Sequence, residues 1–215
     1  MNQQPESPYV ARPADSGQAP KGNLAITAEP AIEPISTVEA KKHLRVDFAD
    51  DDTYIAALIT AARRYCEKVQ GRKYITQTLT YALDNIPGVG TEITLPVLPI
   101  ISFDSVTILQ KNTTAITVTA SFYDTDLQGG KIVLNDDFTT EYDADLLPIY
   151  NAFVITFKAG YGAAGANVLS EIKQAMLLII GHLYEHREET SDGKEVKQIP
   201  LAAAALLQLD RNFNL

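Results

Sequence analysis

Val168–Arg187 reads VLSEIKQAMLLIIGHLYEHR, and this stretch decides the fold of the chain. Its middle part, Ala175–Ile180, is apolar on every side of the predicted helix. A helix that is apolar all round has to be covered all round. The stretch therefore either forms the centre of its own subunit's core or packs one face on a neighbouring subunit.

A short helix is predicted well before this stretch, and its start can be read from local signals. Ser36-x-x-Glu39 has the pattern of a capping box, in which the two side chains bond to each other's backbone amides. Ile35 stands just outside the box, where an apolar residue often packs on the first turn. The helix is expected to run to about Leu44.

The next helix is amphipathic. Apolar residues recur at spacings of three and four between Tyr54 and Val69, and Gly71 stands where a left-handed carboxyl-terminal cap is expected. Asp50–Asp52 precede the helix, where the helix dipole favours negative charge, and we expect one of these carboxylates to cap the free amides. The triplet lacks the alternating ligand spacing of a calcium loop, so capping is the preferred interpretation.

Between Tyr74 and Lys158 the pattern changes from a helical repeat to alternation. Thr78–Leu83 is the clearest case, because apolar residues alternate there with threonine and alanine. Such strands bury one face and expose the other. The predicted strands are Ile75–Leu83, Glu92–Leu95, Ser105–Gln110, Ile116–Tyr123, Lys131–Leu134 and Ala152–Lys158.

Short strands with close turn signals predict an antiparallel sandwich or small barrel inserted between helices. The fold class is therefore α+β: a small α-helical bundle, with helices before and after, and an inserted antiparallel β sandwich or small barrel. We expect a helical domain from residues 35–73 and 165–210, an inserted β domain at 74–160, and a tail at 211–215. Residues 1–34 hold six of the eleven prolines and are expected to form a disordered arm.

Composition excludes several classes of function. The net charge of -9 argues against binding nucleic acid by neutralising phosphates. The longest apolar run, Ala175–Ile180, is far too short to span a bilayer, and the amino terminus lacks the layout of a signal peptide, so we expect a soluble, cytoplasmic chain with no membrane partner. Cys66 is the single cysteine, which rules out an internal disulfide framework, and we expect it to be a buried small hydrophobe.

One pattern is typical of catalysis. His182, Glu185 and His186 match H-x-x-E-H, in which two histidines on one helix face chelate zinc beside a catalytic glutamate. A zinc hydrolase needs a third protein ligand and an open coordination position. The residues available for that role are His43, Glu188, Glu189 and Asp192. The competing interpretation, which we prefer, is that the two histidines are polar-face or interface residues near a helix end, with no metal, no cofactor and no enzymatic activity.

Several local motifs occur in a fixed order from Ile35 to about Asp210. They are ISTVEAKKHLRVD (Ile35–Asp47), DDD (Asp50–Asp52), YIAALI (Tyr54–Ile59), GRKYITQT (Gly71–Thr78), FKAGYG (Phe157–Gly162), IKQAMLL (Ile172–Leu178) and HLYEHRE (His182–Glu188). Each alone is an ordinary cap, turn or helix, but together this order resembles the head-to-tail connector (adaptor, or head-completion) proteins of tailed phages. The chain departs from the shorter members in its large β region and its long Pro-rich arm.

The resemblance implies a structural protein of the virion, located at the head–tail junction and assembled in the host cytoplasm. Such a protein binds the portal as a closed ring of about twelve copies, extends the DNA channel, and provides a docking surface for the next head-completion or tail protein. DNA would pass through without sequence-specific binding. A role as a tail-completion or stopper protein of the virion is an alternative in the same setting, and a zinc-dependent hydrolase is an alternative from another class.

Candidate contact residues follow from the resemblance. In the family, helices build the ring and the carboxyl-terminal segment reaches the portal. Pro200 opens a last predicted helix, Leu201–Leu209, and we expect removal of Pro200–Leu215 to leave a folded protein that no longer binds the portal. The candidate subunit-interface residues are Met176, Leu177, Ile180 and Tyr184. The candidate portal contacts are Leu206, Leu209, Arg211, Phe213 and Leu215.

Overall fold

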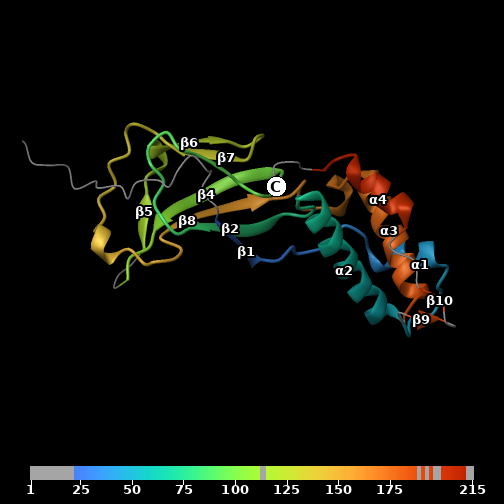
Figure 1. Cartoon of the computed structure of the whole chain (residues 1–215). Coiled ribbons are helices and arrows are strands. Elements are labelled where there is room, and N and C mark those ends of the chain that lie inside the picture. Colours follow the sequence, from blue (N-terminus) through green and yellow to red (C-terminus); the bar gives the residue numbers. More distant parts are fainter. Residues whose placement is uncertain (1–21, 112–114, 188–189, 192–193, 196–199, 212–215) are drawn as a thin grey trace, which may run out of the picture. The chain divides into compact units, whose positions relative to one another are not determined.

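The computed structural model describes residues 22–111, 115–187, 190–191, 194–195 and 200–211. It combines helices with antiparallel sheets, so the predicted α+β class is confirmed (Figure 1). The chain divides into two compact units. We call residues 28–77, 96–101 and 159–215 the helical unit, and the remainder, which is residues up to 27, 78–95 and 102–158, the sheet unit.

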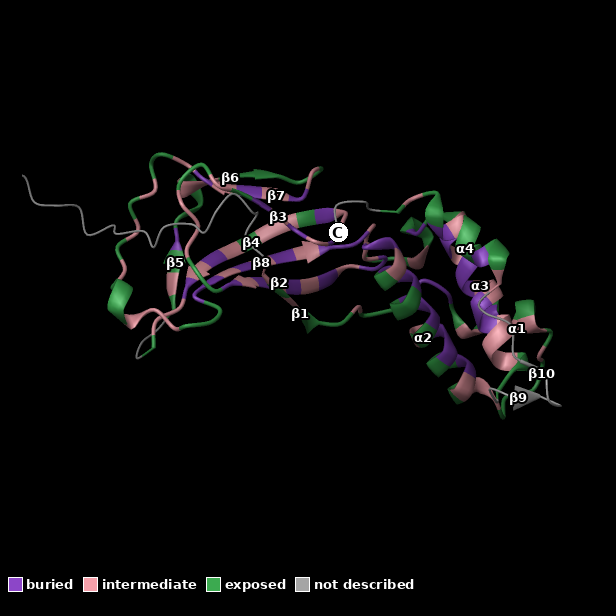
Figure 2. Cartoon of the chain, viewed as in Figure 1, coloured by how far each residue is buried: buried purple, intermediate pink, exposed green. Residues whose placement is uncertain are grey.

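The described part of the helical unit contains helices α1 (Thr37–Leu44), α2 (Asp52–Gln70), α3 (Ser170–Glu185) and α4 (Leu201–Gln208), the 3-10 turn η3 (Gly165–Asn167) and the two-residue antiparallel strands β9 (Thr190–Ser191) and β10 (Lys194–Glu195). Helix α3 contacts α1, α2 and α4. Its buried residues join those of the other helices in one core (Figure 2). The all-apolar helix is therefore the centre of its own subunit's core, which is the first of the two predicted alternatives.

The caps of α1 and the end of α2 form as predicted. The Ser36 amide donates to Glu39 Oε2 at 2.8 Å, and the Glu39 amide donates to Ser36 Oγ at 3.2 Å, so the capping box is confirmed. Ile35 is buried beside it. Gly71 ends α2 in the left-handed conformation with φ +65°. Cys66 is fully buried, as predicted, and burial raises the pKa of its thiol to about 12.

The predicted cap at the start of α2 is wrong. Asp51 occupies the N-cap position, but its side chain bonds to no amide of the helix. Its carboxylate instead accepts hydrogen bonds from Tyr184 and Arg187 at the far end of α3. Asp52 forms an ion pair with Lys41 of α1, with 2.6 Å between Nζ and Oδ1. The acidic segment thus joins helices, because tertiary partners compete with the local amides for these carboxylates.

A buried ionic network holds irregular segments of the helical unit against α2. Glu67 Oε1 accepts hydrogen bonds from the Tyr74 amide at 3.1 Å and from Gln77 Nε2 at 2.8 Å. Its other oxygen, Oε2, lies 3.1 Å from Lys73 Nζ and 3.4 Å from Arg63 Nη1. Arg63 is also buried, and its Nε donates to Glu33 in the segment before α1. We call these residues the Glu67 network.

Two of the motifs that carry the family resemblance meet in the helical unit. The Tyr161 amide donates to the carbonyl of Tyr74, and the Thr76 amide donates to the carbonyl of Gly162, both at 3.0 Å. Gly160 has φ +143°, and a Cβ there would lie 2.7 Å from the backbone of Ile75. Glycine is therefore required at 160 for the two segments to approach.

The described part of the sheet unit contains two open sheets. The larger sheet has the strand order β1 (Asn23–Ala28), β2 (Gln77–Leu83), β8 (Phe153–Ala159), β4 (Ile100–Ile108) and β5 (Ile116–Val118). The smaller has the order β3 (Glu92–Thr94), β7 (Lys131–Leu134) and β6 (Tyr123–Asp126), with antiparallel pairs on both sides of β7. Burial alternates along β2 and β8, as predicted for half-buried strands.

Some predicted strand bounds and the predicted arm differ from the structure. The continuous strand predicted at 116–123 is interrupted by the 3-10 turn η1 (Ala120–Phe122), after which β6 begins in the other sheet. Residues 23–28 form β1 at a sheet edge, where the Gly22 amide donates to Tyr81 Oη at 2.7 Å, so the prediction of disorder is wrong for residues 22–34. The rest of that predicted arm, residues 1–21, lies outside the described residues. Among the described residues no helix has the length and apolar character needed to cross a membrane.

Candidate functional site

The carboxyl-terminal end of α4 is tied to the body of the helical unit by polar side chains. Gln70 Nε2 donates to the carbonyl of Leu207 at 2.9 Å. Arg72 donates from Nε to the carbonyl of Asp210 at 2.5 Å, and its Nη2 lies 3.0 Å from Asp210 Oδ1. Tyr161 donates its hydroxyl proton to the other carboxylate oxygen of Asp210. We call Gln70, Arg72, Tyr161 and Asp210 the C-terminal anchor.

Within the anchor, Tyr161 has a raised pKa. Burial, followed by the hydrogen bond to Asp210, raises the pKa of Tyr161 above its ordinary value, so the hydroxyl keeps the proton that it donates. Tyr74 stacks on Tyr161 with ring centroids 6.4 Å apart and donates to Gln70 Oε1 at 2.5 Å. Both polar groups of the Gln70 amide are thus bonded. The point at which the chain leaves α4 is therefore set by a satisfied polar cluster.

Helix α4 presents an apolar face away from the core. Ala203 and Leu207 are buried, while Leu201 is 88% exposed and Leu209, the residue after the helix, is 72% exposed. The exposed residues between them are Ala202, Ala204, Ala205 and Gln208. We call Leu201, Ala202, Ala204, Ala205 and Leu209 the outer face of α4. No charged residue occurs in the helix, so this side has the composition of a helix face that packs on protein.

The predicted portal contacts occupy different positions on and after this helix. Leu206 is half-buried and packs against the core, whereas Leu209 and Arg211 are exposed. Phe213 and Leu215 lie outside the described residues. Sequence reasoning missed Leu201, although its place beside Pro200 in an all-apolar helix was a usable signal. It also missed the anchor, because nothing local in the sequence pairs Arg72 or Tyr161 with Asp210.

The predicted subunit-interface residues divide in two. Met176 and Ile180 are fully buried in the core of their own subunit, so the structure corrects their assignment: neither is available to a neighbour. Their side chains face the inside because α1, α2 and α4 surround α3. Leu177 and Tyr184 are half-buried and keep part of their surface in solvent, and for these two the interface role stays a prediction.

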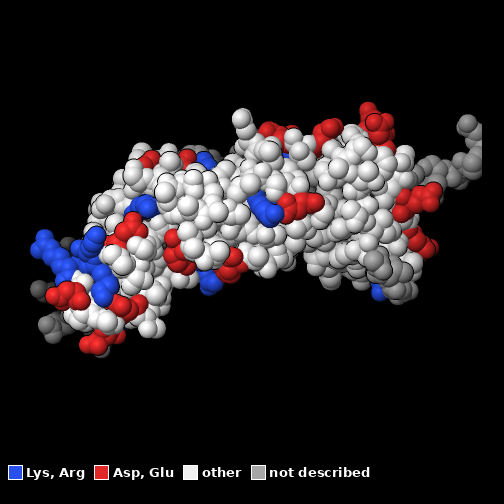
Figure 3. All heavy atoms as spheres, turned by 180° about the vertical axis from the view of Figure 1, so that it is seen from behind, with Lys and Arg blue, Asp and Glu red and all other residues white. Residues whose placement is uncertain are grey.

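Tyr184 belongs to a second polar cluster, which joins the end of α3 to the start of α2. Its hydroxyl donates to Asp51 Oδ2 at 2.5 Å, and Arg187 Nη2 lies 2.8 Å from the same oxygen. The guanidinium carbon of Arg187 lies 4.7 Å from the ring centroid of Tyr54 and 5.0 Å from that of Tyr184. The Tyr184 hydrogen bond, followed by that of Arg187, lowers the pKa of Asp51. Figure 3 shows basic and acidic side chains gathered together at the α1 end of the helical unit.

The H-x-x-E-H pattern lies at the end of α3. The rings of His182 and His186 stack with centroids 4.7 Å apart, and His186 Nδ1 lies 3.0 Å from the His182 carbonyl oxygen, an atom of its own helix. Within the described residues no group of three His, Cys, Asp or Glu side chains has the spacing to hold a metal ion. Glu188, Glu189 and Asp192 lie outside those residues. The described geometry thus places both histidines at the end of α3, and the choice between the two interpretations stays a prediction.

The exposed apolar outer face of α4 is typical of a surface that contacts another protein. Comparison with known proteins identifies the family: a model described as head completion protein matches residues 33–206. The chain therefore belongs to the head completion protein family. It is a structural protein of the virion with a head-to-tail connector role, located at the head–tail junction, as the sequence motifs indicate.

Solved structures share the fold. The neck of an empty gene transfer agent particle, computed with C6 symmetry, contains a chain that matches with a TM-score of 0.71 and 20% identity, over 90% of this chain and 97% of that one. A chain in the virion of the native gene transfer agent particle matches with a TM-score of 0.71 and 20% identity, over 89% and 96%. A chain in the neck of the native gene transfer agent particle, computed with C12 symmetry, matches with a TM-score of 0.64 and 19% identity, over 89% of this chain and 97% of that one. No curated protein matches the chain.

Proposed function

We propose that this chain is the adaptor that binds the portal as a closed ring, extends the DNA channel and provides a docking surface for the next head-completion or tail protein. The observation that carries the proposal is the outer face of α4, where Leu201 and Leu209 are strongly exposed together with Ala202, Ala204 and Ala205. Exposed apolar faces of this kind mark contacts with other proteins. The portal is the partner that the family's role calls for at the carboxyl-terminal segment.

The C-terminal anchor supports this assignment. Arg72 and Tyr161 hold Asp210, so the position of the chain just before the tail is fixed on the helical unit. A segment whose origin is held in place loses less conformational freedom on binding than one that starts from a loose end. The anchor thus makes the tail a better ligand for a partner than its short length alone would suggest.

The ring proposal draws on the related solved structures, whose necks were computed with C6 and C12 symmetry. A closed ring needs two different complementary patches on each subunit, because each copy contacts its two neighbours with different surfaces. Leu177 and Tyr184 are the candidates that stay partly exposed on α3. The acidic net charge of -9 suits a channel through which DNA slides, because it disfavours adhesion to phosphates.

The structure changes the experiment that tests portal binding. Removal of Pro200–Leu215 would take Ala203 and Leu207 out of the core and leave the Gln70 amide without its partner, so this truncation lowers stability as well as removing the candidate contact. That the truncated protein stays folded remains a prediction. The better variants remove residues 211–215 only, or replace Leu201 and Leu209 with glutamate. Leu201 and Leu209 are exposed, so the glutamate substitutions touch no buried side chain.

The measurement is co-sedimentation of the full-length protein with purified portal rings from the same particle. We expect Leu201→Glu with Leu209→Glu to weaken binding by roughly tenfold or more, since a charge buried in an apolar contact is costly. Leu127→Glu, at an exposed leucine of the sheet unit, is the matched control and should bind as the wild type does. Unchanged binding of the double variant would remove α4 from the portal contact. Native mass spectrometry of the portal complex reports the number of copies.

A further inference from the structure

The sheet unit presents two adjacent, strongly exposed apolar side chains on one turn. Ile149 and Tyr150 are each 70% exposed, more than any other large apolar residue among the described residues of this unit. They follow Pro148 in the turn that leads into β8. Singly exposed apolar residues are ordinary on protein surfaces, whereas neighbouring ones on a protruding turn call for an explanation.

Hydrogen bonds hold the chain on both sides of this turn. Asn151 adopts a left-handed conformation with φ +57°, and its amide donates to Asp84 Oδ1 at 3.0 Å. On the other side the Lys111 amide donates to the carbonyl of Leu146 at 2.7 Å, at the end of the 3-10 turn η2 (Ala144–Leu146). Ile149 and Tyr150 are therefore exposed on a preorganised turn. Preorganisation lowers the entropy that a binding residue loses on contact, and a rigid tyrosine is a frequent anchor of protein interfaces.

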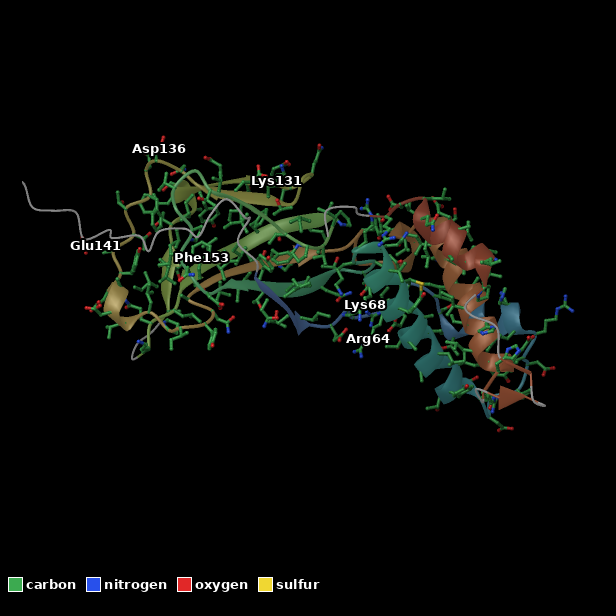
Figure 4. The ribbon with its side chains drawn as sticks, in the orientation of Figure 1. Arg64, Lys68, Lys131, Asp136, Glu141 and Phe153 are labelled. Atoms are coloured by element: carbon green, nitrogen blue, oxygen red, sulfur yellow. The ribbon has the colours of Figure 1, made fainter. Side chains whose placement is uncertain are left out.

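The surroundings of the turn are hollowed and acidic. A cavity of about 180 Å³ lies beside it, with Asp84, Lys111, Tyr142, Asp145 and Ile149 among its lining residues. Between Lys131 and Lys158 the sequence contains no Lys or Arg. The acidic residues in that interval are Asp136, Asp137, Glu141, Asp143 and Asp145. Figure 4 labels Asp136 and Glu141 on the segment between β7 and η2, and Figure 3 shows more acidic than basic side chains at this end of the sheet unit.

We propose that the Ile149–Tyr150 turn is a docking knob, which inserts into an apolar pocket with a basic rim on the tail-side protein that joins after this chain. Charge complementarity selects this occupant, because the acidic residues of the segment that precedes the knob attract a rim of Lys and Arg. The same charges repel nucleic acid. They also disfavour contact with the same end of a second copy of this chain. The proposal rests on the proposed adaptor function and assigns its second docking surface to a definite set of residues.

The test separates attachment to the head from attachment of the tail. Portal-bearing heads assembled without this chain are incubated with wild-type or variant protein, washed, and then mixed with purified tails of the same particle. Immunoblotting of the washed heads reports retention of the protein, and negative-stain electron microscopy counts the joined particles. The test variant is Ile149→Ser with Tyr150→Ser. Val89→Ser with Leu127→Ser, at two other exposed apolar sites of the sheet unit, is the matched control.

We expect the knob variant to be retained on heads as the wild type is, and to join tails at least about tenfold more slowly, since loss of two central anchors typically costs that much. Joining at the wild-type rate would overturn the proposal. Loss of retention on the heads would also overturn it, because the turn would then contact the portal. A changed subunit number in native mass spectrometry would overturn it in favour of a contact between copies. If wild-type protein is not retained on the heads, the adaptor function itself fails, and the knob assignment with it.

The basic rim is tested separately with Asp136→Asn combined with Glu141→Gln. Circular dichroism confirms that the variant is folded. We expect tail joining to slow a few-fold at low salt and to depend less on salt than it does with the wild type, because rim charges act mainly on the rate of association. If the salt dependence of tail joining were unchanged, the partner's pocket would not have a basic rim.

Discussion

In the helical unit, segments far apart in the chain are joined through buried charged and amide side chains, whereas in the sheet unit they are joined through backbone pairing over an apolar core. The buried polar side chains of the described structure are Arg63, Glu67, Gln70 and Gln77, and they all belong to the helical unit. The buried side chains of β2 and β8 within the sheet unit are apolar or aromatic, such as Leu79 and Phe157.

The difference has a physical reason. Strands satisfy their backbone groups by pairing, which also sets their register, so side chains only have to fill the core. Residues 28–36, 71–77 and 159–169 of the helical unit are mostly irregular, so backbone bonds such as that from the Tyr161 amide to the Tyr74 carbonyl satisfy only some of their backbone groups. Directional side chains such as Glu67 bond others, as the bond from the Tyr74 amide shows. The helical unit is therefore expected to be sensitive to the loss of single polar groups, and the sheet unit to the loss of apolar volume.

The largest expected effect comes from Glu67→Ala. It leaves Arg63, Lys73 and Gln77 without their shared carboxylate, and removal of one partner from a buried ionic cluster costs about 3–5 kcal/mol of unfolding free energy. Urea unfolding measures the loss, and hydrogen exchange should place it in the helical unit. Leu79→Ala is the counterpart in the sheet unit, with an expected cost of about 2–5 kcal/mol and lost protection in β2 and its neighbours. If both variants lost protection from hydrogen exchange in the same unit, the contrast between the helical unit and the sheet unit would be contradicted.

A smaller effect is expected from Tyr161→Phe, which removes one bond of the C-terminal anchor. Asp210 keeps Arg72 as a partner, so we expect a loss of about 1–2 kcal/mol and faster hydrogen exchange at the end of α4. Tyr81→Phe removes one hydroxyl bond from the sheet unit, the one to the Gly22 amide, and serves as the matched variant. It should cost about 0.5–1.5 kcal/mol. If Tyr81→Phe were the more damaging of the two, the helical unit would not be the more dependent on polar contacts.

Ser36→Ala tests the local part of the helical unit. The substitution removes the hydroxyl that accepts a hydrogen bond from the Glu39 amide, and loss of such a cap costs about 1 kcal/mol of unfolding free energy. Equilibrium unfolding of the two proteins under identical conditions is the measurement. Ser36→Thr, which keeps the cap, should retain most of the stability. A loss as large as that of Glu67→Ala would show that the cap has a tertiary role as well.

The smallest effect concerns pH. Hydrogen bonds to Ser36, backbone first and side chain second, lower the pKa of Glu39 below its ordinary value of 4.5. A carboxylate whose pKa is lower in the folded state stabilises that state above its ordinary pKa, and this contribution is lost as the pH falls through the lowered value. The stability advantage of the wild type over Glu39→Gln should therefore be present at about pH 6 and shrink below about pH 4. If the stability difference between the wild type and Glu39→Gln stayed constant over this pH range, it would come from the shape of the side chain and not from its charge.

Local signals in the sequence were enough for much of the fold. The capping box at Ser36 and the left-handed cap at Gly71 were predictable because each depends on residues within a few positions of one another. The ordered motifs predicted the family, and the match over residues 33–206 confirms it. Of the candidate site, the apolar carboxyl-terminal helix was predictable from composition, since α4 contains no polar residue before Gln208.

Competing partners explain where the predictions failed. Asp51 was expected to cap α2, but Tyr184 and Arg187 offer its carboxylate stronger partners from more than a hundred residues away. Met176 and Ile180 were expected at a subunit interface, yet α1, α2 and α4 cover them within one chain. Nothing before residue 35 has an apolar pattern, and β1 forms there because the edge of β2 offers it backbone partners.

The sequence by itself determined the helices and most of the strands, where α1 begins and α2 ends, and to which family the chain belongs, because these depend on short-range patterns and their order. The tertiary structure decided which sides of α3 are covered, which groups hold Asp210 at the end of α4, and that Ile149 and Tyr150 stand exposed. These features depend on side chains that meet only after the chain has folded. Several partners compete for each such side chain, and no local sequence pattern encodes which of them binds it.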